Sequence, residues 1–490
     1  MEDMELFGNK PTLKLLTEES KDRIHQAALE ILREMGMEVR HRESLDLLKD
    51  AGCAVSGDNV VRIPEKMVKR ALEGAPRSVV VYNRKGDPAM DLGGDRSYFG
   101  TGSDLLYTLD PETGKRHRST LQDVRRAAQV CDALPNIDFI MSFAHPSDVA
   151  PGESYLQSFR AMLENSTKPI VCTAECRRDL GAMHEMAVIV RGRPDDFRER
   201  PFFIHYAEPT SPRKHPVESL DKLLFCAEAG VPVVYSPAPM AGATAPITIA
   251  GHVSQGIAEC LCGMVIHQLK SPGAPFILGM GPAVMDMATA QSSYNAPEYL
   301  LAYMAVQEMG RFYDLPTWGY AGTCDTHAVD GQAAFEGGLS AFLSSMLGSN
   351  LNHDVGYMDF GRTGSLLLVV MMDEIIDQVR RIRDGVPVTD ETLALSVMRE
   401  VGLGGHFLGH MHTLQNLQRT QWRPVLLNRA GYEKWVEKGR RSFQDKASDK
   451  LKRILETHSP EPLPAPAVEK VYEVVKRFLH PPESGPGSEP

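Results

Sequence analysis

The chain lacks the basic surface and the long apolar segments that mark several large classes of protein. Its 490 residues carry 53 Lys and Arg against 64 Asp and Glu, which gives a formal net charge of −11, and no basic run offsets this excess. Nucleic acids and anionic membranes attract basic surfaces, so we expect neither as a partner. We also expect no membrane-spanning segment, since no apolar stretch in the sequence reaches the required length.

Cysteine is scarce and unpatterned. We see no signal peptide ahead of the eight cysteines, and scattered cysteines without one are typical of reduced thiols in a cytoplasm. We therefore expect a cytoplasmic protein without disulfides. The cysteines are Cys53, Cys131, Cys172, Cys176, Cys226, Cys260, Cys262 and Cys324.

The motifs of conventional cofactor, phosphoryl and serine-hydrolase chemistry are missing. No Gly-rich dinucleotide fingerprint follows a predicted strand, and there is neither a P-loop nor a nucleophile elbow. Two groups have suitable atoms for zinc but lack the CxxC or HExxH spacing that fixes a tetrahedral shell. They are Cys172 and Cys176 with His184, and Cys260 and Cys262 with His267. We predict no bound metal, with zinc as the weaker alternative.

Short apolar runs separated by helix-like segments are what the sequence does contain. Such alternation indicates parallel βαβ units, and eight units over about 270 residues match a (β/α)8 TIM barrel of the α/β class. An open doubly wound sheet is the alternative. The eight runs lie at 97–102, 137–143, 169–173, 201–206, 232–236, 275–279, from 317, and from 351.

The predicted barrel occupies residues 96–370 and leaves extensions at both ends. Residues 1–95 are predicted as an N-terminal α-rich cap, since Thr17 is a suitable N-cap for a helix that ends at Gly36. Residues 371–458 are predicted as a C-terminal helical region packed on the barrel. Residues 459–490 are predicted as a Pro-rich linker, a short helix near 469–479 and a disordered tail.

A barrel carries its chemistry at the C-terminal ends of its strands, which nominates residues without any motif. For any one of these residues, the ordinary alternative is a structural role, as a carboxylate in a loop or as a hydrogen-bonded histidine in the core. Their convergence on one barrel mouth is what favours a site. In strand order they are Gly102, Ser103, Asp104, Ser142, His145, Thr173, Glu175, His205, Tyr206, Glu208, Ser236, Met240, Met280, Asp325, His327, Asp330, His353, Asp354 and Tyr357.

Aromatic residues make up only 7% of the chain, yet several lie near predicted strand ends beside carboxylates. Ring faces hold quaternary ammonium groups because the negative face of each ring attracts a diffuse positive charge. Such a mouth suits a cationic ligand, and ordinary core packing is the alternative reading. The residues are Tyr98, Phe99, Tyr206, Tyr235, Trp318, Tyr357 and Phe360.

Several long stretches resemble one known family. They are Arg118-Ser-Thr-Leu-Gln-Asp123, Ala133-Leu-Pro-Asn-Ile-Asp138, Gly242-Ala-Thr-Ala-Pro-Ile-Thr-Ile-Ala-Gly251, Asp325-Thr-His-Ala-Val-Asp-Gly-Gln-Ala-Ala-Phe-Glu336, Asp373-Glu-Ile375, and Val401-Gly-Leu-Gly-Gly-His-Phe-Leu408 with His412-Thr413. These stretches are similar to stretches of the trimethylamine methyltransferase family. They occur in the order expected for that family and extend over most of residues 10–450. That resemblance implies a (β/α)8 barrel that transfers a methyl group from a methylamine to the cobalt of a partner corrinoid protein.

The founding branch of that family carries a pyrrolysine, and this chain has none. It therefore resembles the non-pyrrolysine branch, whose characterised members demethylate quaternary amines such as glycine betaine, proline betaine and carnitine. A quaternary ammonium already has a neutral amine as its leaving group and needs no further activation. The chain departs from the family at Thr326-His327, where Ser-Lys is common, and the sequence leaves the methyl donor open.

The resemblance also implies roles for the nominated residues. The residues predicted as catalytic are Asp325, His327, Asp330, Gln332 and His353, and those predicted to bind the substrate are Tyr98, Phe99, His145, Tyr206, Glu208 and Tyr357. Among them, Tyr98, Phe99, Tyr206 and Tyr357 are cage candidates, and Glu208, Asp325 and Asp330 are electrostatic partners. His145, His327 and His353 are predicted to anchor or orient the substrate, with Gln332 in support. Cobalamin is expected as a co-substrate on a corrinoid carrier protein, and the chain as a homo-oligomer. A zinc-dependent barrel methyltransferase or hydrolase and a non-catalytic betaine-binding protein are the competing hypotheses.

Overall fold

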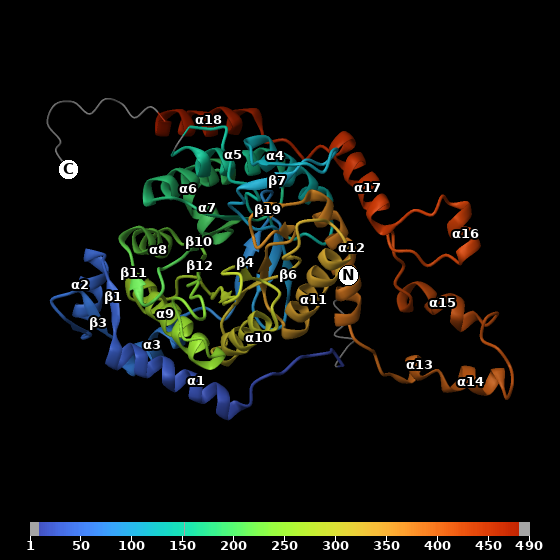
Figure 1. Cartoon of the computed structure of the whole chain (residues 1–490), viewed down its shortest axis with the longest axis horizontal. Coiled ribbons are helices and arrows are strands. Elements are labelled where there is room, and N and C mark those ends of the chain that lie inside the picture. Colours follow the sequence, from blue (N-terminus) through green and yellow to red (C-terminus); the bar gives the residue numbers. More distant parts are fainter. Residues whose placement is uncertain (1–8, 151, 480–490) are drawn as a thin grey trace.

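The computed structural model describes residues 9–150 and 152–479, in which helices alternate with short strands around a central parallel assembly (Figure 1). This confirms the predicted α/β class. Seven of the eight predicted apolar runs contain a regular strand. These strands are β6 (Tyr98–Phe99), β9 (Ile170–Cys172), β10 (Phe203–Ala207), β12 (Val233–Tyr235), β13 (Phe276–Leu278), β16 (Trp318–Tyr320) and β17 (Leu351–His353).

The parallel strands pair in two sheets, in the orders β13-β12-β10-β9 and β16-β17-β6. Single parallel bridges join the two sheets at both ends. Leu278 at the end of β13 pairs with Thr317 beside β16, and residues 139 and 140 of the run at 137–143 pair with Gly100 and Ile170. Each of the eight runs therefore pairs on both sides, in the order in which the runs occur along the chain.

A helix follows each of the eight runs and packs outside it. Local sequence explains several of their ends: a capping box of Thr120 and Asp123 begins α4, and Asp330 caps the start of α11. The helices are α4 (Leu121–Ala133), α5 (Ser154–Asn165), α6 (Arg177–Arg191), α7 (Pro194–Glu199), α8 (Val217–Ala229), α9 (Ile249–Lys270), α10 (Pro297–Phe312), α11 (Gly331–Leu347) and α12 (Leu366–Arg383). Two of them, α6 and α7, follow the same run, between β9 and β10.

Helix α9 corrects the expectation about apolar stretches. Its 22 residues are long and apolar enough to cross a membrane by length and composition, although 83% of the most apolar window is buried inside the fold. The helix contacts α1, α3, α8 and α10, so its apolar faces meet other helices on several sides. A helix that is apolar all round is expected in such a position.

The side chains enclosed by the parallel strands form a separate apolar cluster, because alternate residues of a strand point to the same face. The hairpin of β4 (Val79–Tyr82) and β5 (Pro88–Leu92) packs its own apolar residues against this cluster. Sequence analysis did not predict this hairpin. The cluster consists of Val79, Val81, Met90, Leu92, Phe139, Met141, Val171, Ile204, Val234, Ile277, Trp318 and Leu351.

The N-terminal region has the predicted helices and more strand than expected. Thr17 caps α1 (Glu18–Glu30), which continues in a π-helical turn (Ile31–Met35) up to Gly36 at φ +75°. The remaining elements are β1 (Met37–Val39), α2 (Arg42–Asp50), β2 (Ala54–Val55), β3 (Val60–Arg62) and α3 (Glu65–Gly74), and β1 also pairs with β11 (Lys214–His215).

Short strands in the loops form two small sheets. One contains β7 (Tyr107–Leu109), β8 (Arg116–Arg118), β18 (Tyr357–Met358) and β19 (Thr363–Gly364), and the other pairs β14 (Val284–Met285) with β15 (Ser292–Ser293). These strands lie in the loops that follow β6, β17 and β13. The loops that follow the strands therefore have defined structure.

After α12 the chain leaves the body and later returns to it (Figure 1). Helix α17 packs on α12 and α4, and α18 packs on α6 and α5. Helix α18 begins four residues before the predicted position, and the predicted tail at 480–490 lies outside the described residues. The C-terminal helices are α13 (Asp390–Leu393), α14 (Leu395–Val401), α15 (Met411–Thr420), α16 (Tyr432–Glu437), α17 (Phe443–Thr457) and α18 (Ala465–Leu479).

Candidate active site

A cavity of about 200 Å³ opens at the C-terminal ends of the parallel strands. Its walls come from β10, β16 and β17 and from the segments that follow β12, β13 and β17. Other hollows are larger, but helices and loops on the outer surface line them. The cavity is lined by Tyr206, Glu208, Ser236, Ala238, Met280, Gly281, Pro282, Ala283, Tyr294, Tyr299, Tyr303, Trp318, Gly319, Tyr320, His353 and Asp354.

Three rings from neighbouring strands form one wall. The ring of His353 stacks on Trp318 with centroids 4.1 Å apart, and Tyr206 lies 5.4 Å from Trp318 on another strand. All three side chains come from parallel strands, so the rings sit on a rigid part of the fold. The wall presents aromatic surface to whatever occupies the cavity.

Tyrosines from α10 and its preceding loop form the second wall. Tyr320 packs edge to face against Tyr299 and Tyr303, at centroid distances of 4.9 and 4.7 Å. The Tyr320 hydroxyl donates to the carbonyl of Tyr294 at 3.0 Å, which ties the loop to the strand. Burial raises the pKa of Tyr294, Tyr299, Tyr303 and Tyr320, so their hydroxyls stay neutral at physiological pH.

Two carboxyl groups face the cavity. Glu208 accepts a hydrogen bond from the Tyr206 hydroxyl at 3.2 Å. Solvent reaches the Glu208 side chain, yet it lies within the concave wall, and desolvation there raises its pKa. Asp354 is buried, and desolvation raises the pKa of its carboxyl well above the usual range. Both carboxyls become more acidic when a cation enters beside them.

His353 and Asp354 lie beside each other, and burial favours the uncharged form of each. The Nδ1 atom of His353 lies 2.6 Å from the carbonyl of Gly319, which fixes the ring proton on Nδ1. The Nε2 atom lies 3.3 Å from Oδ2 of Asp354. Burial lowers the pKa of His353 to about 4 and raises the pKa of the Asp354 carboxyl. Positive charge in the cavity would favour ionisation of that carboxyl.

The backbone around Asp354 is tightly packed. Asp354 adopts φ +73°, in the left-handed region that non-glycine residues seldom occupy. A Cβ atom on Gly102 would collide with Oδ1 of Asp354 and with the ring of Tyr357, whose hydroxyl donates to the carbonyl of Ser103. Gly102 therefore allows the strand end to approach Asp354 closely.

The structure separates the residues predicted as catalytic. Of the five, only His353 lines the cavity. Asp325 accepts hydrogen bonds from the Ser293 hydroxyl and from the backbone N–H groups of Tyr294 and Asn295, so it holds the loop that presents Tyr294. Asp330 is the exposed N-cap of α11.

The other two predicted catalytic residues lie on the surface. His327 is largely exposed and pairs with Asp359 at 3.0 Å. Gln332 is exposed and donates to Glu336 at 2.8 Å, within the first turns of α11. Neither lines the cavity.

The predicted binding residues also divide. Tyr206 and Glu208 line the cavity. The Tyr98 hydroxyl instead accepts from the Asp91 backbone N–H on β5, because β6 begins beside the hairpin. Phe99 points outward, where the guanidinium of Arg380 lies 5.7 Å from its ring.

His145 and Tyr357 lie near the strand ends without lining the cavity. His145 lies 3.6 Å from Asp104, and the hydrogen bond to Asp104 raises the pKa of His145. Tyr357 is buried against Gly102, next to the carboxyl of Asp354. Both therefore support the loops that surround the cavity.

Sequence reasoning missed Tyr294, Tyr299 and Tyr303. These residues follow β13 in a loop and helix, whereas the search was confined to residues next to strand ends. A signal was present, because five of the chain's 14 tyrosines fall between positions 294 and 320. Clustering of a scarce residue type would have found this wall.

The two cysteine groups considered for zinc have other partners. Cys260 donates to the carbonyl of Tyr235, and the ring of His184 packs on Phe197 and Phe225. Within residues 9–150 and 152–479, no three His, Cys, Asp or Glu side chains are grouped as a metal shell requires. Burial raises the pKa of Cys131, Cys172 and Cys260, which keeps these thiols protonated.

Comparison with known proteins places the chain in a family. The profile described as trimethylamine methyltransferase (MTTB) matches residues 2–478. Trimethylamine methyltransferase MttB of Desulfitobacterium hafniense strain DCB-2 is 31% identical over 461 residues, covering 94% of this chain and 93% of that one. Glycine betaine methyltransferase of Desulfitobacterium hafniense strain Y51 is 30% identical over 457 residues, covering 92% and 94%.

Among solved structures, the monomethylamine methyltransferase of Methanosarcina barkeri aligns over 97% of this chain and 95% of its own, with 12% identity and a TM-score of 0.45. The family profile spans nearly the whole chain, and the two curated relatives each cover more than nine tenths of it. The chain therefore belongs to the trimethylamine methyltransferase family and is a methyltransferase.

Proposed function

We propose that the protein transfers a methyl group from a quaternary amine, such as glycine betaine or a similar betaine, to Co(I) of a corrinoid carried on a separate protein. The observation that carries this proposal is the cavity itself, which is lined by the rings of Trp318, Tyr206 and His353, by a wall of tyrosines, and by the carboxyl groups of Glu208 and Asp354. Aromatic faces and carboxylates are the groups that hold a methylated ammonium ion. The family to which the chain belongs supports the same chemistry.

The proposal includes a (β/α)8 barrel as the scaffold. Its support is the pairing of all eight apolar runs with neighbours on both sides, together with a helix after each run. In such a barrel the cavity lies at the C-terminal face, where barrel enzymes carry their sites. We keep the predicted division into a cap at 1–95, a barrel at 96–370, a helical region at 371–458 and a C-terminal segment at 459–490 as part of this proposal.

In the proposed reaction, Co(I) donates an electron pair to one N-methyl carbon, the carbon–nitrogen bond breaks, and the nitrogen keeps the bonding pair. The products are methyl-Co(III) and the demethylated amine. The protein's task is to hold the ammonium against the rings with one methyl pointing out of the cavity. Near-attack geometry of this kind supplies up to about 7–11 kcal/mol in ideal cases.

The carboxyl groups of the cavity affect how tightly the cation can be bound without slowing the reaction. The positive charge of the substrate disappears as the amine leaves, so a site that binds the cation too tightly opposes the reaction. Glu208 and Asp354 carry raised pKa values and hold less negative charge than free carboxylates would at the same pH. Their partial neutralisation suits a cation that must be released as a neutral amine.

The lining of the cavity also limits where the carboxylate of a betaine can lie. No Lys or Arg is among the described residues that line the cavity. The carboxylate of a betaine therefore finds no cation there and is repelled by Glu208, so we expect it to point out of the mouth. The ammonium head supplies the recognition, and a carboxylate-free quaternary amine should enter as readily.

Among the site residues predicted from sequence, we propose that Tyr206, Glu208 and His353 contact the substrate. Asp325 positions the tyrosine wall through its loop. We propose supporting roles for Tyr98, Phe99, His145, His327, Asp330, Gln332 and Tyr357. The carrier must approach the cavity, so we propose the strand-end face as its docking side, in a cytoplasmic enzyme.

The test is anaerobic mixing of the purified protein with Co(I)-cobalamin, or with a corrinoid carrier protein, and one amine at a time. The panel contains glycine betaine, proline betaine, carnitine, γ-butyrobetaine, choline and trimethylamine, and the cobalt absorbance is followed. Formation of methyl-Co(III) with a quaternary amine supports the proposal and identifies the donor. Amine binding without methyl-Co(III), in the presence of the carrier, would leave a binding protein and refute it.

A further inference from the structure

A hollow of about 600 Å³ lies on the outer surface, where the segment 421–441 meets the start of α17. It shares no described lining residue with the cavity at the strand ends. Among the described residues that line it, five are positively charged and none is Asp or Glu, so we call it the basic hollow. The five are Arg423, Arg429, Lys438, Arg441 and Lys446.

The concentration of positive charge in the basic hollow runs against the charge of the whole chain. The formal net charge is −11, so acidic side chains outnumber basic ones overall. Like charges gathered in one place repel one another and destabilise the fold. A concave surface lined by one sign of charge also focuses its field and attracts ions of the opposite sign. The basic hollow therefore attracts anions to a chain that repels them elsewhere.

The carboxylates near the basic hollow neutralise only one of its five cations. Asp449 pairs with Arg441 at 2.7 Å. Asp445 belongs to the capping box of α17, and Glu374 accepts hydrogen bonds from three backbone N–H groups at 425–427. The carboxylates of α16 do not line the hollow. Within the described part of the chain, the other four cations form no ion pair with a carboxylate.

Backbone carbonyls hold two of these four cations in place. The Nζ atom of Lys446 donates to the carbonyl of Leu426 at 2.7 Å, and the guanidinium of Arg429 donates to the carbonyl of Trp422 at 2.8 Å. A carbonyl fixes the position of a cation without cancelling its charge. Lys and Arg each have several N–H donors, so others remain for a ligand. Donors already fixed in position bind a ligand at a lower entropic cost.

An aromatic ring completes the wall of the basic hollow. The Nε1 atom of Trp435 donates to the carbonyl of Arg441 at 3.1 Å, which holds the half-buried indole at the hollow. Nucleic-acid bases stack on such rings whatever their identity, because every base has a π-face. The combination suits a ligand that carries both negative charge and a flat ring.

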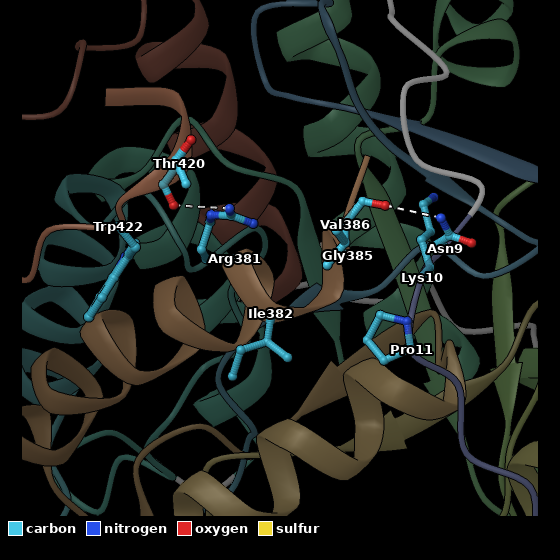
Figure 2. A pocket seen from close by; sticks show the side chains of 9 residues that line it. All are labelled: Asn9, Lys10, Pro11, Arg381, Ile382, Gly385, Val386, Thr420 and Trp422. Atoms are coloured by element: carbon cyan, nitrogen blue, oxygen red, sulfur yellow. Dashed lines mark hydrogen bonds between the residues drawn. The ribbon is translucent and has the colours of Figure 1, made fainter. Parts of the chain in front are cut away.

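A neighbouring hollow shows that this charge is not general to the surface. It has a volume of about 660 Å³ and is lined at Thr420 and Trp422 by the residues on either side of Gln421 (Figure 2). Its two cations already have partners. Lys10 lies 3.7 Å from Asp95, and Arg381 donates to the carbonyl of Thr420 at 3.2 Å. The basic hollow differs in both the number and the pairing of its cations.

We propose that the basic hollow binds a nucleoside di- or triphosphate, with its phosphates among the four cations and its base on Trp435. This site goes beyond the proposed methyl transfer and does not depend on it. One phosphate group carries about −1.5 to −2 at pH 7, so at least two are needed to balance four cations. The Arg fork matches the spacing of phosphate oxygens. The volume lies within the range of about 300–1,000 Å³ that is typical of small-molecule sites.

The first test is isothermal titration calorimetry on the full-length protein at low ionic strength, without divalent metal. The probes are ATP, ADP, pyrophosphate and inorganic phosphate, added separately. We expect one ATP or ADP to bind per chain, and pyrophosphate and phosphate to bind at least about tenfold more weakly because they lack a base. Added salt should weaken ATP binding, since it screens charges on the surface.

The double variant Arg423→Gln with Lys438→Gln should bind ATP at least about tenfold more weakly than the wild type. Both side chains are exposed, so the helical content should not change. Lys434→Gln is the matched control, because it removes the same charge from α16 at a position that does not line the basic hollow. Its affinity for ATP should equal that of the wild type.

A second measurement uses only the wild type and keeps the proposal testable if the double variant fails to fold. Lysines are acetylated with and without ATP and the modified positions are read by mass spectrometry. ATP should protect Lys438 and leave Lys434 reactive.

Several results would overturn the proposal. They are no binding of ATP or ADP, pyrophosphate binding as tight as that of ATP, equal losses of affinity in the double variant and in Lys434→Gln, and equal protection of Lys434 and Lys438. A double variant that loses the corrinoid carrier and keeps its affinity for ATP would also overturn it, since the hollow would then serve a protein partner.

Discussion

At the scale of single residues, the site depends on side chains whose charge is set by burial. Asp354 is the clearest case. Its carboxyl is buried and has a strongly raised pKa, and its backbone adopts a φ in the left-handed region. The sequence shows only an aspartate after an apolar run. Its unusual state arises from the loops packed around it.

Replacing Asp354 with Asn should make stability less dependent on pH. A folded-state pKa raised above the unfolded value of about 3.9 means that the folded form retains a proton the unfolded form has lost. Wild-type stability therefore falls as pH rises from about 4 through the raised pKa. Asn cannot ionise and tolerates positive φ.

We expect the wild type to lose at least about 1 kcal/mol more than Asp354→Asn between pH 5 and pH 8, measured by urea unfolding. The substitution keeps the shape of the side chain, so the far-UV spectrum should not change. Parallel stability curves for the two proteins would show that Asp354 is already ionised in the folded form.

Replacing Glu208 with Gln should weaken recognition of the cation. We expect kcat/KM for the best quaternary amine to fall about tenfold, which corresponds to about 1.4 kcal/mol. The wild-type kcat/KM should rise with pH as the carboxyl ionises through its raised pKa, and this rise should vanish in Glu208→Gln. Tyr206→Phe, which keeps the ring and removes the bond to Glu208, is the control and should retain the pH-dependent rise.

At the scale of elements, loops and helix starts decide which side chains meet. Asp325 and Asp330 were both predicted as site residues, and both lie in the stretch from Asp325 to Glu336 that resembles the family. In the structure, each accepts hydrogen bonds from backbone N–H groups. Asp325 holds residues 293–295 beside the cavity, and Asp330 starts α11 outside it. The two positions therefore provide a matched comparison.

We expect Asp325→Ala to raise the KM for the amine about tenfold, because the loop that carries Tyr294 loses three hydrogen bonds. Asp330→Ala should cost about 1 kcal/mol of stability, as the loss of an N-cap does, and leave the KM unchanged. Steady-state kinetics and thermal unfolding of both variants provide the measurements. Equal effects on KM would contradict the separation of their roles.

The predictability of the elements follows from the range of the forces involved. The caps at Thr17, Thr120 and Asp330 use bonds within four residues. Thr17 was predicted as a cap from the sequence, whereas Asp330 was predicted as a site residue. The hairpin of β4 and β5 was missed because its apolar faces become meaningful only against the strands it closes. A sequence pattern confined to one helix or strand predicts that element, but it does not specify which other elements the helix or strand packs against.

At the scale of the whole molecule, the C-terminal helix belongs to the body. Val471, Val474 and Val475 of α18 are buried, and Arg477 pairs with Glu185 of α6. The sequence alone left open whether this helix packs on the fold or meets a partner. The structure seats it on α5 and α6.

A chain that ends at residue 458 should therefore be less stable by about 2–4 kcal/mol, since three buried valines and their helix are removed. Urea unfolding of this chain and of one that ends at Leu479 measures the effect. Methyl transfer below the unfolding temperature should persist, because α18 contributes no residue to the cavity. Loss of activity in the folded, shortened chain would show that α18 also serves the carrier.

The sequence by itself determined the class of the fold, the order of the eight apolar runs, the helix caps and the family, because hydrophobic periodicity and short-range hydrogen bonds are local properties. Only the tertiary structure decided that Tyr206, Trp318 and His353 line the same cavity as tyrosines of α10. It also decided the direction of the pKa shifts of His353 and Asp354, since burial causes them. Such convergence depends on packing between segments more than a hundred residues apart, which no local pattern encodes.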